Sequence, residues 1–535
     1  MRRIALVLAV LALILGACVP PNDDGYVVPE PPFGVGFVEP GDANLLYIGS
    51  ILTPTGIVTG EMLVDATGHI LYIGEDSSSH PEAAGATRLV CAHGLAVPGL
   101  IDAWRHMAYA GGSPVDTDGE RYNHRHQWRL GLGGHTEIPF TSTNRPRYDE
   151  AGMILSGTTS AAGPILGTLT GMVRNLRSPS DTIGLFTGSE SVDVNTFPLD
   201  DSSGFMTTDP TAYDDYPPDP DSQLCTASAV IAAEGITAEA RCEFLAMTGS
   251  GPAGTDILSP KTALVHGVAL LPQDVQRMAA AGSTLVWTPR SDLHLYGNTA
   301  PVTIADRMGC NIALGSTWTI TGSPNLLEEL KTARFFNQNY LDGYFSDEEL
   351  FAMATLNSAR AYHVDDRIGT LEVGKIADFA VFDTRAHAGL ASVFAAELAD
   401  VAAVFVGGTV LCGDTYLVDP IRGLVTGSET LAVGSTTKRI FAQEQFGATI
   451  AEITVAGDFP LVYASVDIET EIVPSRPSEY TGVASALDLD GDGIGNSLDN
   501  APSVFNPPRP VDGGVQGDQD GDGIGDVIDT TPLPP

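Results

Sequence analysis

The chain has 535 residues, of which 43% are hydrophobic, so it is long enough for several domains and at least one large core. Its 67 acidic residues outnumber its 27 basic residues and give a formal net charge of -40. This excess of negative charge repels phosphate backbones and anionic lipid headgroups, which excludes nucleic acid and electrostatic membrane docking and favours cations as partners.

The N-terminus is typical of a secretion signal. Two arginines precede an apolar run over residues 4–15, which is too short to span a membrane. The run ends in Leu15-Gly16-Ala17-Cys18, which resembles the lipobox of bacterial lipoproteins, where cleavage leaves a lipid-bearing cysteine. We therefore expect a signal peptide over residues 1–18, lipidation of Cys18, and export to the outer membrane or cell surface of a bacterium. Residues 19–44 are rich in proline, glycine and acidic residues, which predicts a flexible linker.

Five further cysteines follow, at positions 91, 225, 242, 310 and 412. Cys225 and Cys242 lie in one short stretch, so a disulfide between them and two buried thiols are both open interpretations. None of the five lies in a Cys-x-x-Cys zinc pattern.

The body of the chain alternates between two kinds of pattern. Residues 45–73 have the period-two alternation and tight-turn glycines of short strands. From Gly99 onward, short apolar runs such as Ala263-Leu264-Val265 alternate with helical patterns such as residues 272–281, which indicates β/α units around a parallel sheet. Strand-like patterns then return in residues 368–381 and 401–416.

Several short motifs occur in a fixed order along this body. They are Pro98-Gly99-Leu100-Ile101-Asp102, Ser156-Gly157-Thr158-Thr159, Leu264-Val265-His266-Gly267, Ala313-Leu314-Gly315-Ser316, residues 353–360 and residues 369–378. With them, residues 45–414 resemble the amidohydrolase superfamily, most of all its deaminase and imidazolonepropionase-type branch. The resemblance implies an α/β fold: a (β/α)8 TIM-like barrel over residues 98–367, with a flanking β-sandwich built from residues 45–97 and 368–420.

The resemblance also implies a metal site, which this sequence fills only in part. The family has two histidines on strand 1, one each on strands 5 and 6, and an aspartate on strand 8. Here His106 and His266 match two of these positions. The other three carry Trp104, Ile231 and Thr317, and an indole or an aliphatic side chain offers no lone pair to a metal.

The remaining family carboxylate is Glu234, which in deaminase relatives moves a proton to the substrate. Two histidines alone hold a metal weakly, so zinc or another divalent transition metal in the barrel is a doubtful cofactor unless Glu234 becomes a third ligand. His124-Arg125-His126 is another His-x-His, but it follows a Gly- and Asp-rich loop, which favours a pair of loop histidines. His135, His294 and Asp292 are candidates for the barrel mouth.

The C-terminal part has a different character. Residues 421–483 form a β-rich or connecting segment of unknown role, and residues 484–535 contain two loops with oxygen ligands at regular spacing. The candidate calcium-binding residues are Asp488, Asp490, Asp492, Asn496 and Asp499 in the first loop, and Asp518, Asp520, Asp522, Asp526 and Asp529 in the second. The loops resemble thrombospondin type 3 repeats, which implies calcium as a cofactor and an extended arrangement. An acidic solubilising tail is the alternative.

Three hypotheses for function follow. The first is a lipoprotein with a depleted metal site that is weakly active or only binds a small molecule, because hydroxide generation needs a metal and a base. The second is an active metal-dependent amidohydrolase or deaminase, hydrolysing non-peptide carbon–nitrogen bonds with His106, His266 and Glu234. The third is a calcium-dependent surface adhesion or spacer protein. The sequence favours the first hypothesis. It leaves the oligomeric state open.

Overall fold

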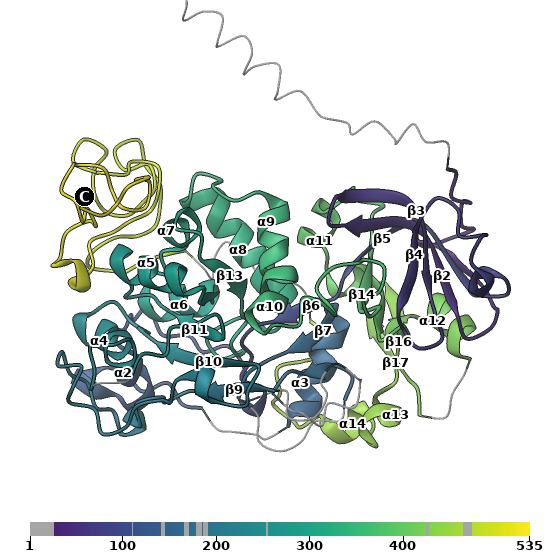
Figure 1. Ribbon diagram of the computed structural model, residues 1–535, viewed down its shortest axis with the longest axis horizontal. Coiled ribbons are helices and arrows are strands. Elements are labelled where there is room, and N and C mark those ends of the chain that lie inside the picture. Colours follow the sequence, from purple (N-terminus) through teal and green to yellow (C-terminus); the bar gives the residue numbers. More distant parts are fainter. Residues whose placement is uncertain are drawn as a thin grey trace, which may run out of the picture.

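The computed structural model describes residues 26–109, 111–140, 145–164, 171–177, 185, 191–252, 255–423, 427–463 and 473–534. The expected signal peptide and its Cys18 lie outside these ranges. A β-sandwich lies at one end of the molecule, a β/α barrel lies in the middle, and the C-terminal tail packs against the far side of the barrel (Figure 1). Within the described ranges, no helix combines the length and hydropathy needed to cross a membrane.

The barrel is built from eight parallel strands in the described part of the chain. In order they are β6 (Leu100–Asp102), β7 (Thr158–Ala161), β8 (Arg174–Asn175), β9 (Val192–Asn195), β10 (Ala227–Ala232), β11 (Thr262–His266), β12 (Thr284–Trp287) and β13 (Asn311–Leu314). A hydrogen bond from the Ala103 amide to the Leu314 carbonyl, 3.0 Å long, joins β13 back to β6. Between β8 and β9, the Val192 amide donates to the carbonyl of Leu176, which follows β8, so the ring of strands closes.

Helices with well-defined ends surround this ring. They include α2 (Arg125–Leu130), α3 (Pro146–Leu155), α4 (Ala238–Met247), α5 (Pro272–Ala281), α6 (Pro289–Tyr296), α7 (Val302–Arg307), α8 (Leu326–Tyr340), α9 (Asp347–Met353) and α10 (Leu356–Ala361). Side chains of Thr237, Asn325 and Ser346 accept backbone N–H groups at the starts of α4, α8 and α9. Helix α5 begins with proline and ends at Gly282 in the left-handed region, as the sequence pattern predicts.

The centre of the barrel is filled by apolar side chains, among them Ile101, Ile231, Val265 and Val286. Trp104 belongs to this cluster and is one of the largest fully buried side chains of the chain. The residue that replaces a family histidine is therefore part of the barrel core.

The sandwich is one strongly bent, ten-stranded sheet in the described residues. Its strands are β1 (Phe37–Glu39), β2 (Leu45–Thr53), β3 (Gly56–Val64), β4 (Ile70–Gly74), β5 (Thr87–Pro98), β14 (Phe379–Asp383), β15 (Val401–Val406), β16 (Thr409–Asp414), β17 (Glu429–Val433) and β18 (Thr436–Ile440). A register shift between β2 and β5 skips residues 92–94 and marks the bend. The inner cluster includes Tyr47, Phe379 and Phe405, the last two stacked at 4.3 Å.

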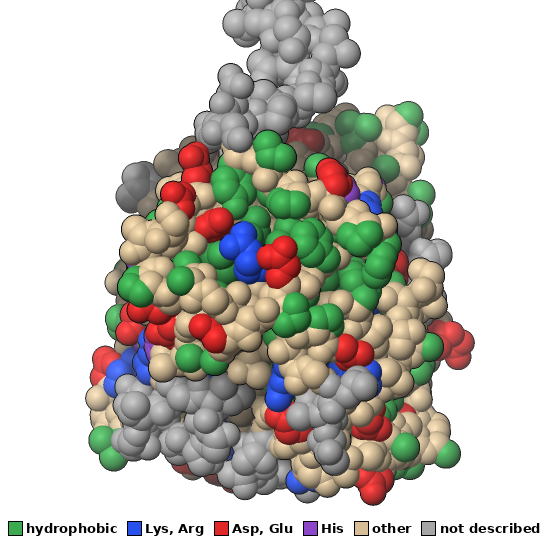
Figure 2. All heavy atoms as spheres, turned by 90° about the vertical axis from the view of Figure 1, so that its right-hand side faces the viewer, with side chains coloured by type: hydrophobic (Ala, Val, Ile, Leu, Met, Phe, Trp, Pro, Cys, Tyr) green, Lys and Arg blue, Asp and Glu red, His purple; other side chains and the backbone are tan. Residues whose placement is uncertain are grey.

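Short helices lie beside the sandwich and where it meets the barrel: α11 (Ala391–Phe394), which contacts β14 and α8, α12 (Thr415–Arg422), which contacts β16, α13 (Ala442–Phe446), and α14 (Ile450–Ile453), which contacts α3. Figure 2 shows the free end, where hydrophobic side chains gather around a basic and acidic pair. Leu46, Ile48 and Leu63 of the sandwich belong to a separate buried cluster.

Two segments differ from their expected roles. Phe37–Glu39, inside the expected linker, pairs antiparallel with β5, because its apolar residues cover the sheet edge. Strands β17 and β18, in the segment with no assigned role, pair through β18 with β16 and extend the sheet. Cys225 and Cys242 are both free thiols, so the structure has no disulfide between them.

The tail is docked on the barrel and does not have the extended form that the sequence suggests. Phe505 packs against Tyr340 of α8, with ring centroids 5.7 Å apart, and against Phe336 at 6.3 Å. Arg509 donates to the Val268 carbonyl, 2.6 Å, and the Val511 amide donates to the Ile236 carbonyl, 3.0 Å. Apolar and basic residues between the acidic loops therefore attach the tail beside β10 and β11.

Candidate active site

A cavity of about 280 Å³ opens at the carboxyl ends of the barrel strands. Its lining residues follow the strands in turn, from His106 after β6 to Thr317 after β13. This is the end at which barrels of this kind place their functional side chains. Aromatic side chains form much of the wall: Tyr109, Trp128, Phe140, Phe197 and Trp318.

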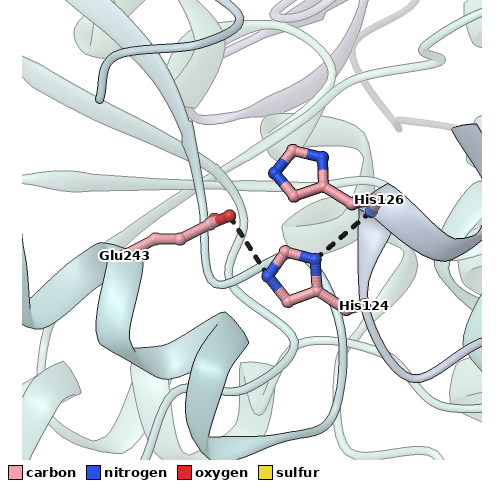
Figure 3. Close-up of side chains that lie close together, drawn as sticks. All are labelled: His124, His126 and Glu243. Carbon is pink, nitrogen blue, oxygen red and sulfur yellow. Dashed lines mark hydrogen bonds and ion pairs between the residues drawn. The ribbon is translucent and has the colours of Figure 1, made fainter. Parts of the chain in front are cut away.

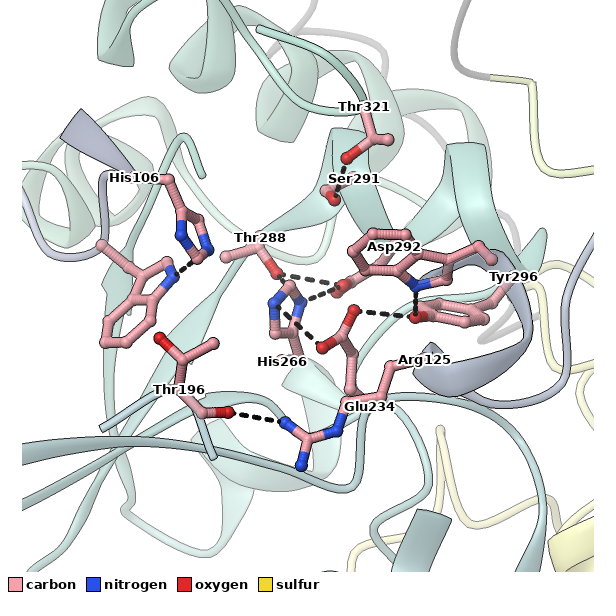
Figure 4. Close-up of polar contacts among 12 residues, drawn as sticks. His106, Arg125, Thr196, Glu234, His266, Thr288, Ser291, Asp292, Tyr296 and Thr321 are labelled. Atoms are coloured by element: carbon pink, nitrogen blue, oxygen red, sulfur yellow. Dashed lines mark hydrogen bonds and ion pairs between the residues drawn. The ribbon is translucent and has the colours of Figure 1, made fainter. Parts of the chain in front are cut away.

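Glu234 follows β10 and faces into this cavity (Figure 4). Its Oε1 accepts a hydrogen bond from the Tyr296 hydroxyl, 2.7 Å, and that hydroxyl accepts one from Trp128 Nε1, 2.9 Å. All three side chains are buried. The relay fixes one carboxylate oxygen and leaves Oε2 directed toward His266.

His266 ends β11 and lies opposite Glu234, with its Nε2 3.8 Å from Oε2 of Glu234. Its Nδ1 lies 2.8 Å from Asp292 Oδ1 and 2.9 Å from the Thr288 hydroxyl. Burial favours the neutral ring, but the Glu234 charge and the Asp292 hydrogen bond outweigh it and raise the pKa of His266. Its φ of +71° is rare for a residue with a side chain, and such strain is common where a fold fixes a functional group. Asp292, expected at the mouth, thus orients His266 from behind.

His106 has its metal-binding nitrogen occupied. The Trp104 indole N–H donates to His106 Nε2 over 3.0 Å, and the two rings meet edge to face. Burial and the charges of His266 and Arg105 lower the pKa of His106 to about 3, so its Nε2 lone pair is the acceptor of this bond.

The other two replaced positions also line the cavity. Ile231 offers no donor atom, and the buried Thr317 hydroxyl has no hydrogen-bond partner in the described part of the chain, on a backbone with φ of +57°. A family-type metal would need a free His106 nitrogen and ligands at these two positions. The residues present at the barrel mouth therefore do not fit a transition metal.

His124, His126 and Glu243 form a second group with metal-type side chains (Figure 3). One ligand atom from each of His124, His126 and Glu243 lies within 4.8 Å of the others, and all three residues are buried. His124 caps the start of α2 and His126 lies in its first turn, so these are not the loop histidines that the sequence suggested. The Arg125 guanidinium pairs with Asp201 and, at 3.0 Å, with Glu243.

The hydrogen bonds of this group place a proton on each ring. The His126 amide donates to His124 Nδ1, and the Arg129 guanidinium lies 2.8 Å from His126 Nδ1 as its donor. A neutral imidazole that accepts at Nδ1 carries its proton on Nε2. Those Nε2 atoms face Glu243 at 3.4 Å and Asp201 at 3.0 Å. A metal could bind here only after both rings change their proton positions, so the arrangement seen is a buried charge cluster around Arg125.

Two other candidate histidines lie away from the cavity. His135 pairs with Glu120 over 2.9 Å, and His294 lines a separate hollow with Arg121 and Asp116. Sequence reasoning missed Arg125, Arg129 and Tyr296, which do line or support the cavity. The i, i+4 spacing of the two arginines on α2 was the available signal.

In the tail, carboxylates of Asp488, Asp490 and Asp492 lie within 4.8 Å of one another, as do those of Asp518, Asp520 and Asp522. Asn496 and Asp526, at the ninth positions, close their loops by accepting backbone N–H groups over 2.9 Å. Asp490, Asp499 and Asp529 each have a buried carboxylate oxygen with no hydrogen-bond partner among the described residues. Burial and the neighbouring carboxylates raise the pKa of Asp490 to about 7.

Comparison with known proteins identifies relatives for part of the chain. Residues 233–411 match the Amidohydrolase family. The chain is 30% identical over 172 residues to a 5-methylthioadenosine/S-adenosylhomocysteine deaminase of Pyrococcus abyssi, which covers 30% of this chain and 40% of the relative. It is 32% identical over 130 residues to the enzyme of that description from Teredinibacter turnerae, covering 24% and 29%. The chain thus spans less than half of the length of these curated relatives.

Solved structures agree in fold. An atrazine chlorohydrolase of Arthrobacter aurescens complexed with zinc has a TM-score of 0.52 at 17% identity, covering 71% of this chain and 97% of that one. A triazine hydrolase variant has a TM-score of 0.51 at 17% identity, covering 72% and 97%. These likenesses confirm the barrel with its β-sandwich. The sequence matches support the amidohydrolase superfamily and its deaminase branch. The region of the family match contains Glu234, His266 and Asp292 but not Trp104, His106 or Ile231.

Proposed function

We propose that this protein is a hydrolase of the deaminase branch that acts on the carbon–nitrogen bond of an amino-substituted planar heterocycle. The observation that carries the proposal is the facing pair of Glu234 and His266 in the cavity, 3.8 Å apart. Each is fixed by buried partners, Tyr296 for Glu234 and Asp292 for His266. The aromatic wall suits a flat ring.

The chemistry of this pair is general acid and base catalysis. One of the two groups accepts the proton that the attacking water loses as its oxygen bonds to the ring carbon. The other supplies the proton that the leaving nitrogen gains as the carbon–nitrogen bond breaks and ammonia departs. The first hypothesis from the sequence, a barrel that only binds a small molecule, is favoured by a different observation, the Trp104 N–H on His106 Nε2. It is the second candidate function.

Ammonia release from a panel of amino-heterocycles, including adenosine and guanine derivatives and aminotriazines, tests the proposal. Glu234→Gln keeps the size of the side chain but removes its proton transfer, so we expect turnover to fall about 100-fold. Glu348→Gln, an exposed glutamate on α9, is the control and should keep full activity. Binding of a heterocycle without ammonia release would reject the hydrolase and support the second candidate. A panel that neither binds nor reacts would reject both.

We also propose that the two tail loops bind calcium. The unpartnered, buried oxygens of Asp490 and Asp499 support this, because a buried carboxylate oxygen needs a cation or a donor. Calcium titration of the full-length protein by calorimetry should show binding that weakens at least about tenfold in Asp490→Asn, because one charged ligand is lost. Unchanged calcium binding in Asp490→Asn would contradict the assignment, and the tail would then be an acidic solubilising segment. The third hypothesis, an adhesion or spacer role, depends on these loops.

Export and lipidation remain proposals that rest on the sequence before the described residues. A labelled fatty acid incorporated into the wild-type protein, and absent from Cys18→Ser, would support the lipid anchor. Label retained in Cys18→Ser would reject it.

A further inference from the structure

The cavity concentrates positive charge in a strongly acidic protein. Of only 27 basic residues, three arginines line it: Arg125, Arg129 and Arg177. Glu234 is the one carboxylate among the described lining residues. Field lines from these guanidinium groups are focused by the low-dielectric aromatic wall, which favours a negatively charged ligand.

The charge of Arg129 is less compensated than that of Arg125. Arg125 is neutralised by Asp201 and Glu243, both buried. Arg129 lies 2.8 Å from His126 Nδ1 and donates to the Ser202 carbonyl over 3.3 Å, and neither acceptor is negatively charged. Within the described ranges Arg129 forms no ion pair. Burial and the nearby Arg125 charge lower the pKa of Arg129, and the charges of Glu234 and Asp201 oppose this shift in part.

The geometry of Arg129 leaves it able to bind. Its guanidinium lies over the Phe197 ring, 4.2 Å from the centroid, which holds the planar group by a cation–π contact. Among the described residues, His126 and Ser202 accept two of its five N–H donors, which leaves three for a ligand. A guanidinium held in this way matches a carboxylate or phosphate with charge-assisted hydrogen bonds.

We propose that the cavity selects planar amino-heterocycles that carry an anionic group, and that Arg129 is the residue that recognises this group. The inference rests on the proposed function for the reacting end of the substrate, which Glu234 and His266 hold. Arg129 would hold the opposite end, with the flat ring between the aromatic walls. The anion is a carboxylate or a phosphate, because both present paired oxygens to a guanidinium.

Calorimetric binding to the full-length protein tests the inference with matched ligands: 2-aminopyrimidine-5-carboxylate, its neutral carboxamide, and a phosphorylated aminopyrimidine. We expect the wild-type protein to bind at least one anion about tenfold or more tightly than the carboxamide. Arg129→Gln should remove this preference while changing carboxamide binding less than about twofold. Arg129→Lys should keep part of this preference, because lysine carries the positive charge but lacks the paired, planar N–H donors of a guanidinium. Which anion is preferred identifies the group.

Arg385→Gln, at an exposed arginine paired with Asp383, is the matched control and should leave the preference unchanged. The inference is overturned if the wild-type protein has no preference, if neither kind of ligand binds, or if Arg129→Gln weakens both ligands equally, which would give Arg129 only a structural role beside His126. Because binding is measured without turnover, the experiments can reject the anion preference without rejecting the proposed hydrolase, and the reverse. Charge preference without ammonia release rejects only the hydrolase, and turnover without charge preference rejects only this inference.

Discussion

A chain that carries Trp104→His, Ile231→His and Thr317→Asp together is expected to bind zinc with a stoichiometry near one, whereas we expect the wild-type barrel mouth to bind none. The first change removes the indole N–H that now occupies His106 Nε2. The other two place donor atoms at cavity positions beside His106 and His266. Elemental analysis and a competitive zinc titration would measure the effect, and we expect an affinity at least about a thousandfold above that of the wild-type barrel, because five ligands replace two occupied or isolated ones.

Two controls make this test specific. Trp104→Phe frees His106 Nε2 without adding a ligand and should not bind zinc tightly. Because removing the buried indole leaves a cavity and costs about 3 kcal/mol or more, unfolding is also measured with and without zinc, and zinc should stabilise only the triple variant. Stoichiometric zinc in the wild-type protein that is lost in His106→Ala would show that the barrel mouth already holds a metal. Loss in His124→Ala instead would place the metal in the group behind Arg125.

The fold was predictable because its signals are local. Strands β10, β11 and β13 coincide with short apolar runs of the sequence, and β11 and β13 carry family-like motifs at their ends. The orienting partners of the site were less visible. Asp292 is separated from His266 by 26 positions, and only the packing of α6 onto β11 brings the carboxylate behind the imidazole. Spacing in the sequence carries no such information.

The His124 to His126 segment shows why a loop interpretation failed. The residues before it are rich in glycine and aspartate, which predicts a solvated turn. In the fold Arg125 pairs with Asp201 and Glu243, from distant segments, and these ion pairs bury the start of α2. Long-range charge pairing overrode the local composition.

In the tail, the sequence predicts the loops but not their packing on the barrel. Regular aspartate spacing predicts the loops, and both have the compact turns that the spacing requires. It does not predict docking. Phe505 lies between the two loops in a short apolar stretch, and it inserts against Tyr340 and Tyr480. An apolar residue inside an otherwise acidic tail was the available signal for a packed segment.

Removing Arg174 is expected to destabilise the junction between barrel and sandwich by about 3–5 kcal/mol, because it leaves a buried carboxylate without its partner. Arg174 in β8 donates to both oxygens of Asp378, over 2.6 and 2.8 Å, and both side chains are almost fully buried. Asp378 also accepts the Gly407 amide over 2.7 Å, at the turn between β15 and β16. The aspartate that ends the family-like motif at residues 369–378 therefore ties the first half of the barrel to the sandwich. Urea unfolding of Arg174→Ala and Asp378→Ala would measure this loss.

A double-mutant cycle distinguishes this pair from an ordinary surface ion pair. If Arg174 and Asp378 act mainly on each other, Arg174→Ala combined with Asp378→Ala should cost less than the sum of the single changes, since no unpaired charge remains. Arg88 and Glu39 form the matched comparison: the ion pair is 3.2 Å long but about half exposed, so its removal should cost less than about 1 kcal/mol. Strictly additive losses at Arg174 and Asp378 would mean that each stabilises the junction through other contacts. The unfolding transition is also informative, because a weakened junction should let the sandwich and the barrel unfold in separate steps, which the wild-type contact would couple.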